Sequence, residues 1–290
     1  MQIDLVCRQL TTLHGLDDVT ALQYLDAEHN KLTILQGLER CTVLQTLDVG
    51  YNRLTTLQGL ERCTALQELH VRRNQLTTPQ GLEQATALQF LHVTDNRLTT
   101  LQGLEQATAL QVLYVNSNQL TTLRGLERAT ALRELEVDNN QLITLQGLER
   151  ATALQTLYAA GNRLTTLQGL ERATALRELS IYANPLTTLQ GLERAAALQY
   201  LKIGQNHLQF SYLQVNDART WRQLCRYIHN KFVSTSMTLC WRVPPYVCLH
   251  ILEYAVPDAR HWLHKSKIDL ILAVYKSCTR NKIIFPGEKK

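Results

Sequence analysis

The stretch LQTLYAAGNRLTTLQGLERATA, residues 154–175, decides the architecture of most of this chain. Closely similar stretches occur before and after it at a fixed period of 22 residues, and one asparagine in each copy marks the period. These asparagines are Asn30, Asn52, Asn74, Asn96, Asn118, Asn140, Asn162, Asn184 and Asn206. A period of this length, kept over nine copies, is typical of a solenoid in which each repeat covers its neighbours.

The consensus LxxLxVxxNxLTTLxGL resembles the leucine-rich repeat, in the 22-residue form found in bacterial internalins. The resemblance covers residues 1–208 and implies an α/β solenoid that binds other proteins. Its parallel strands would lie on a concave face, with short 3₁₀ or helical turns on the convex side. We expect a partial N-terminal cap unit in residues 1–21, eight full repeats from Leu22 onward, and a partial last repeat from Leu198.

Each repeat has a part that faces the core and a part that faces solvent. Alternate side chains of the short strand, residues 154–159 in the quoted copy, should point inward. The amide of Asn162 carries donors and an acceptor, so we expect it to bond main-chain groups of its own turn and of a neighbouring coil. Gly169 should permit a bend in the return half, whose leucines point back into the core.

The return halves are almost identical from copy to copy, whereas the outward strand positions differ. Divergence on one face only indicates a surface tuned to a protein partner, although drift without selection would leave the same pattern. Tyrosine and arginine anchor many interfaces, and alternating charge sets partner choice. The predicted binding residues are an acidic group (Asp26, Glu28, Asp48), a basic group (His70, Arg72, Arg73, His92), a second acidic group (Glu134, Glu136, Asp138), a tyrosine track (Tyr158, Tyr182, Tyr200), and Tyr51, Phe90 and Tyr114.

Residues 209–290 form a second predicted domain, an all-α module that covers the last coil. They hold 13 Lys and Arg against 5 Asp and Glu, whereas residues 1–208 hold 17 against 20. Residues 243–254 are similar to the opening of an F-box, and residues 221–228 resemble a SOCS box. Both families recruit cullin ubiquitin ligases, which implies an alternative function as a substrate-recruiting adaptor. The candidate adaptor contacts are Leu224, Cys225, Ile228, Val247, Ile251 and Leu252.

Seven scattered cysteines indicate a reducing compartment rather than a disulfide framework. Cys41 and Cys63 occupy the same position in adjacent repeats, so a disulfide and a pair of buried thiols both stay open. The start MQIDLVCRQL lacks the pattern of a classical signal peptide, and no apolar run is long enough for a membrane span. We therefore expect a cytoplasmic protein, or an effector of an intracellular bacterium that is delivered into a host cell by specialised secretion.

No motif of a known catalytic type occurs, since the chain lacks a phosphate-binding glycine loop, a nucleophile elbow and an HExxH helix. We predict a non-enzymatic protein without cofactor or small-molecule substrate. Three weaker alternatives are zinc bound by Cys240, Cys248, His250, His261 and His264, nucleic acid bound by the basic C-terminal end, and a metal held by His70 and His92. The histidine pair has no third ligand in register.

Overall fold

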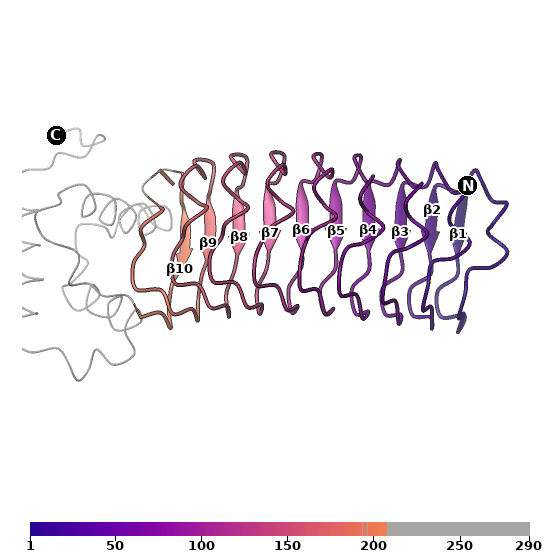
Figure 1. The fold of residues 1–290 in the computed structure, drawn as a ribbon, viewed down its shortest axis with the longest axis horizontal. Coiled ribbons are helices and arrows are strands. Elements are labelled where there is room, and N and C mark those ends of the chain that lie inside the picture. The colour runs from indigo at the N-terminus through magenta and orange to yellow at the C-terminus, as the bar shows by residue number, and fades with distance from the viewer. Residues whose placement is uncertain (193, 196, 208–290) are drawn as a thin grey trace, which may run out of the picture.

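The solenoid is built from one short strand per repeat. The computed structural model describes residues 1–192, 194–195 and 197–207. Within this part the strands are β1 (Gln2–Asp4), β2 (Tyr24–Asp26), β3 (Thr46–Asp48), β4 (Glu68–His70), β5 (Phe90–His92), β6 (Val112–Tyr114), β7 (Glu134–Glu136), β8 (Thr156–Tyr158), β9 (Glu178–Ser180) and β10 (Tyr200–Lys202). They form a single parallel sheet in chain order, as Figure 1 shows. The predicted parallel solenoid is confirmed for these residues.

The strands pair so that equivalent positions of successive repeats lie side by side. Leu25 of β2 is opposite Leu47 of β3, and the same offset of one repeat holds along the whole sheet. The central residue of each strand from β2 to β9 is buried, whereas its two neighbours generally face outward. The outward positions read from the sequence therefore form continuous columns along the solenoid.

The core is a stack of identical apolar layers. In the second full repeat, Leu44, Leu47 and Val49 on the strand side and Leu54 on the return side are all fully buried. Each such side chain contributes about 1.5–3 kcal/mol on burial. Because each coil is covered by its neighbours on both sides, a coil is stable only within the array.

The asparagines form the ladder that the sequence predicts. Asn74 is a typical member: its amide nitrogen donates to the carbonyl oxygens of Val71 (3.1 Å) and Arg72 (3.3 Å) in its own turn, and to that of Val49 (2.9 Å) in the preceding coil. Its carbonyl oxygen accepts the N–H of Leu54 at 2.8 Å. Each asparagine therefore pairs main-chain groups that the bend would otherwise bury without partners.

The convex side differs from the prediction of helical or 3₁₀ turns. In the described residues it is a succession of separate tight turns, such as the bonds from Leu38 N–H to Leu35 C=O (3.3 Å) and from Cys41 N–H to Leu38 C=O (2.9 Å). These bonds recur every third residue, whereas a 3₁₀ helix needs them at consecutive residues. Gly37, at φ +111°, interrupts the helical path, and its N–H bonds to the Glu39 carboxylate at 2.9 Å.

The two aligned cysteines are buried free thiols. The Cys41 thiol lies 3.6 Å from the carbonyl oxygen of Val19, and that of Cys63 lies 3.6 Å from the carbonyl oxygen of Leu38. Burial raises the pKa of Cys63 to about 12, so this thiol stays protonated at neutral pH. The structure therefore decides the open question in favour of small buried side chains that replace alanine.

The predictions for the C-terminal domain lie outside the described residues. They include its helices, the zinc alternative, and the adaptor contacts Leu224, Cys225, Ile228, Val247, Ile251 and Leu252. In the part of the chain that the structure does describe, no helix has the length and hydrophobicity needed to cross a bilayer.

Candidate protein-binding face

The solvent side of the sheet, here called the strand face, carries the columns that begin at Tyr24, Asp26 and Glu28. A fourth column begins at His29, one residue before each asparagine. Its non-glycine members adopt left-handed backbone conformations, for example Tyr51 at φ +53° and Arg73 at φ +52°. Sequence reasoning found Tyr51 and Arg73 but missed the column as a whole. The signal was available, because this position varies between repeats as strongly as the other three columns.

The strand face is acidic. The first three columns, from residue 24 to residue 204, contain eight Asp and Glu but only two cations, Arg72 and Lys202, which gives a formal charge of −6 with neutral histidines. Residues 1–208 as a whole carry only −3. Negative charge is therefore concentrated on this face, where it attracts cationic partners.

At the N-terminal end, an ion pair crosses two coils. Arg72 Nη2 lies 2.6 Å from Glu28 Oε1, and the repeat between them supplies Gly50. A Cβ at Gly50 would lie 3.2 Å from the Glu28 carboxylate and 3.3 Å from Arg72 Cγ. The missing side chain thus leaves the space through which the arginine reaches its partner.

Tyr51 is the centre of a stacked group at the same end. The His29 ring stacks on it with centroids 4.2 Å apart, and the guanidinium carbons of Arg73 and Arg72 lie 5.0 and 5.3 Å from the tyrosine centroid. Arg73 is also ion-paired with Asp95 at 3.2 Å. Both arginines of the predicted basic group are therefore neutralised within the chain, and this region is not the strongly positive patch that the sequence suggested.

Four aromatic rings meet in the middle of the strand face and form what we call the ring cluster: His70, Phe90, His92 and Tyr114. Phe90 lies 4.9 Å from His70 and 5.5 Å from Tyr114 between ring centroids, and His92 lies 5.5 Å from Tyr114. All four side chains are half-buried. The contacts of Phe90 and His92 with Tyr114 are edge-to-face, and such contacts favour a defined arrangement of the rings.

His92 is neutral at neutral pH, which corrects its assignment to a basic group. Burial lowers its pKa from 6.5 to about 4, and the positive charges of Arg72 and His70 act in the same direction. We expect an NMR titration to give a midpoint near 4 for this ring. A midpoint near 6.5 would show that the ring is solvated.

The same shift fixes a pH dependence of stability. Between pH 6.5 and 4 the unfolded chain binds a proton at His92 more readily than the native chain, so this group reduces native stability as the pH falls through that window. His92→Tyr copies Tyr114 at the equivalent position of the next repeat, and it should remove the loss of stability that His92 causes at low pH. Urea unfolding at pH 7 and pH 5 measures how much unfolding free energy each protein loses between the two pH values. An equal loss in both proteins would contradict the prediction.

The acidic sector consists of Glu134, Glu136, Asp138 and Glu178. Glu134 accepts the hydroxyl of Tyr114 at 2.9 Å, and Glu178 accepts that of Tyr158 at 2.8 Å. These hydrogen bonds are one cause of the raised pKa, about 12, of both tyrosines; burial is the largest cause for Tyr114 and the hydrogen bond for Tyr158. The tyrosines are therefore fixed as neutral donors beside the carboxylates.

The inner carboxylates of this sector are also held by neutral donors. Glu136 accepts from the Asn116 amide at 2.6 Å, and Asp138 accepts from the N–H of Ala160 at 2.5 Å. Burial raises the pKa of both carboxyls, and repulsion from Glu134 and Asp138 adds to it at Glu136. None of the four members forms an ion pair with another described residue within 4.0 Å. Lys202 lowers the pKa of Asp138 at longer range, but no described cation pairs directly with the sector.

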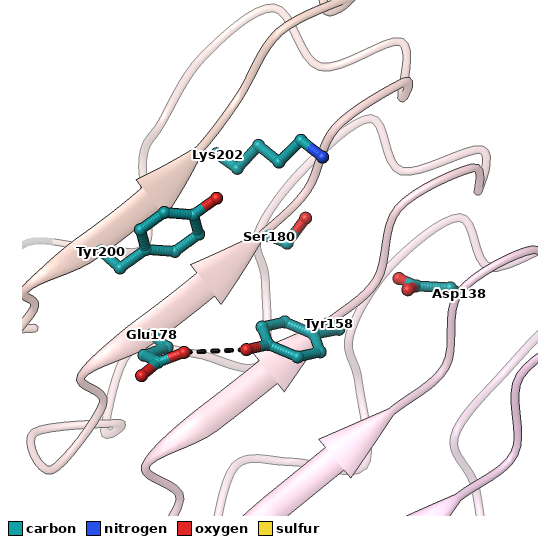
Figure 2. A pocket seen from close by; sticks show the side chains of 6 residues that line it. All are labelled: Asp138, Tyr158, Glu178, Ser180, Tyr200 and Lys202. Atoms are coloured by element: carbon teal, nitrogen blue, oxygen red, sulfur yellow. Dashed lines mark hydrogen bonds between the residues drawn. The ribbon is translucent and has the colours of Figure 1, made fainter.

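A hollow of about 350 Å³ lies at the C-terminal end of this sector, shown in Figure 2. Its lining residues come from β8, β9 and β10 and from the turn after β7: Asp138, Tyr158, Glu178, Ser180, Tyr200 and Lys202. Of the predicted tyrosine track, Tyr158 and Tyr200 line the hollow, while Tyr182 lies under Lys202, whose Nζ is 4.9 Å from its ring centroid. Sequence reasoning did not include Glu178, Ser180 or Lys202, although all three belong to the variable columns.

Comparison with known proteins establishes the repeat type. Residues 20–62, 108–150 and 152–194 match the family model for leucine-rich repeats, two copies at a time. The chain is a leucine-rich repeat protein. Its strand face is the surface on which the repeats differ. Among the described residues, no group of three His, Cys, Asp or Glu side chains is placed to hold a metal ion.

Several solved leucine-rich repeat structures are similar to this chain. A protein of Leptospira interrogans is 27% identical with a TM-score of 0.64, over 71% of this chain and 55% of its own length, so the chain spans about half of that relative. Internalin C2 of Listeria monocytogenes is 26% identical, with a TM-score of 0.60, over 64% of this chain and 83% of its own. The plant peptide hormone receptor RGFR1, solved in complex with RGF2, shares the fold at 20% identity and a TM-score of 0.55, over 71% and 38%. No curated protein sequence matches the chain.

Proposed function

We propose that this leucine-rich repeat protein is a non-enzymatic scaffold that binds a protein partner on its strand face. The observation that carries the proposal is the register of the sheet, which brings the variable columns that begin at Tyr24, Asp26 and Glu28 onto one surface. The fold supports it as well, because RGFR1 is a peptide hormone receptor solved with RGF2.

The strand face has the physical properties of a prepared interface. Tyr51, Arg72 and Arg73 are held in place by stacking and by ion pairs, and the ring cluster is held by its own contacts. Side chains that are already ordered lose little conformational entropy on binding. Aromatic residues and arginine are also the types that contribute most to protein interfaces.

The biological setting is part of the same proposal. Similarity to proteins of Listeria and Leptospira supports a bacterial protein that acts as an effector in a host cell. Fusion of the full chain to a reporter that is active only in host cytosol tests delivery. A fusion that the bacterium expresses but that gives no reporter activity in the host cell would contradict the effector role and leave the scaffold function standing.

Affinity capture with the full-length chain, followed by mass spectrometry, tests the scaffold function. Once a partner is captured, Arg72→Glu with Arg73→Glu, and separately Tyr158→Ser with Tyr182→Ala, should each weaken its binding by about tenfold or more. The second pair copies Ser180 and Ala160 from equivalent positions, so these changes should leave the fold intact, as circular dichroism can verify.

The matched control lies on the convex side. Arg128→Glu with Arg150→Glu makes the same charge change at exposed positions outside the strand face, and binding should stay within about twofold because surface changes away from an interface cost little. Loss of the partner in the control alone would place the interface on the convex side. If neither strand-face pair affects the captured partner, the assignment of this face is wrong.

A further inference from the structure

We propose that the strand face binds an extended segment of a partner protein in which an aromatic or large aliphatic side chain is followed or preceded, three to six residues away, by lysine or arginine. The inference rests on the proposed scaffold function and names the chemistry of its partner. The apolar side chain docks on the ring cluster, and the cationic side chains dock on the acidic sector.

The ring cluster points to an apolar anchor. Its rings come from three adjacent strands, with His70 on β4, Phe90 and His92 on β5, and Tyr114 on β6. The four half-buried rings form a partly exposed aromatic patch, and exposed apolar patches mark interaction sites on soluble proteins. Because His92 is neutral at physiological pH, an apolar group can cover it without desolvating a charge.

The acidic sector points to cations. An ionised carboxylate has about four acceptor sites, and each member of the sector is bonded by a neutral donor at one of them. At the other end of the face Arg72 forms an ion pair with Glu28, whereas no described cation lies within ion-pair distance of the acidic sector, and Lys202 acts on Asp138 only at longer range. Lysine or arginine from a partner would form the stronger, charge-assisted hydrogen bonds.

The hollow offers a place for one cationic side chain. Two carboxylates, Asp138 and Glu178, and two tyrosines line it, against the single cation Lys202 (Figure 2). At about 350 Å³ it is at the small end of the range of ligand clefts, which suits a side chain better than a whole ligand. The chain already places cations over tyrosine rings on this face, with Lys202 over Tyr182 and Arg73 over Tyr51.

The separation of the two regions sets the spacing in the partner. Neighbouring strands lie about 4.8 Å apart, so β5 at the centre of the ring cluster is about 10 Å from β7 and about 19 Å from β9. An extended chain advances about 3.3 Å per residue, which converts these distances to about three and six residues. A segment with this pattern can contact both regions at once.

Four labelled peptides test the inference on the full-length chain by fluorescence polarisation. The probe is Gly-Trp-Gly-Gly-Gly-Arg-Gly-Arg-Gly, in which separations of four and six residues put the tryptophan and both arginines on the same side of an extended chain. The others replace its tryptophan by serine, both arginines by glutamine, or both arginines by glutamate. The probe should bind at least about tenfold more tightly than each of the other three, which corresponds to about 1.4 kcal/mol. Equal binding of the glutamate peptide would overturn the proposal.

Variants taken from the repeats themselves locate the two contacts. Phe90→Thr copies Thr46 and Thr156, and it should remove the preference for tryptophan over serine while keeping the preference for arginine. Glu134→Thr with Glu178→Thr should do the reverse. Asp4→Ser with Asp18→Asn is the matched control, because it removes the same charge from exposed residues of the N-terminal cap unit, outside both the ring cluster and the acidic sector. If the control weakens the probe as much as the acidic-sector pair does, the attraction is unspecific and the inference fails.

Two further outcomes show whether this chain's own C-terminal segment occupies the strand face, and whether the scaffold function stands when this inference fails. Residues 209–290 also carry positive charge and aromatic residues. If the probe does not bind and carbodiimide links the acidic sector to lysines of that segment within a monomer, the occupant is this chain's own segment and the partner proposal is overturned. If the probe does not bind but Arg72→Glu with Arg73→Glu loses the captured protein, the scaffold function stands and only this inference falls.

Discussion

Replacing Asn140 with leucine should lower the free energy of unfolding by about 2–4 kcal/mol, although the two side chains are similar in size. The Asn140 amide donates to the carbonyl oxygens of Val115 and Val137 at 3.0 and 3.2 Å, and its own oxygen accepts the N–H of Leu120 at 2.9 Å. Leucine can replace none of these bonds. The Leu120 N–H would then be buried without a partner, and this is the most costly of the losses.

Urea unfolding of the full-length variant measures the loss, and Asn139→Ser is the control. Asn139 precedes Asn140 directly and is exposed, and the equivalent position in the preceding repeat is Ser117. The control should change stability by less than about 1 kcal/mol, because it touches no buried group and Ser117 already adopts the same left-handed conformation. A leucine variant as stable as the control would show that the asparagine ladder does not hold the coils together.

The sequence predicts the ladder and the columns because both follow from a strictly constant period. With the same residue count in every repeat, Asn74 must lie beside Asn52 and Asn96, and each outward position must lie beside its equivalents. The convex side could not be predicted in this way. The segment LERCT, residues 38–42, has the composition of a helix, but Gly37 has a positive φ and its N–H bonds to Glu39, and these local contacts prevent a helix from forming.

The sequence predicts most of the residues that form the candidate site, but not the contacts between them. Arg72 and Glu28 both belong to columns that vary between repeats, but they are 44 residues apart in sequence and two coils apart in space. Their ion pair depends on the absence of a side chain at Gly50, which lies between them. The neutral state of His92 likewise depends on burial and on nearby charges. Composition suggests a basic patch there, and only the three-dimensional contacts show that its arginines are ion-paired while the acidic sector has no ion pair with a described residue.

Alanine at Gly147 should destabilise the protein by more than about 3 kcal/mol, through backbone strain and a clash together. This glycine has φ +110°, a region that residues with a side chain rarely adopt. An added Cβ would also lie 2.5 Å from the carbonyl oxygen and 2.9 Å from the carbonyl carbon of Leu123 in the preceding coil. Main-chain atoms cannot move aside as a flexible side chain can, so the coils would have to separate. Urea unfolding measures the loss.

The chain contains a control that separates the two effects. Gly103 has φ +111°, but the preceding coil carries Pro79 in place of leucine, and the nearest atoms to an added Cβ, the Cγ and carbonyl oxygen of Pro79, lie 3.4 Å away. Gly103→Ala should therefore cost only the backbone strain, about 1–3 kcal/mol. If both alanine variants lose the same stability, the close approach of the coils contributes nothing, and the glycines serve only the bend. If Gly147→Ala loses clearly more, these glycines also set the distance between coils, and with it the spacing of the columns on the strand face.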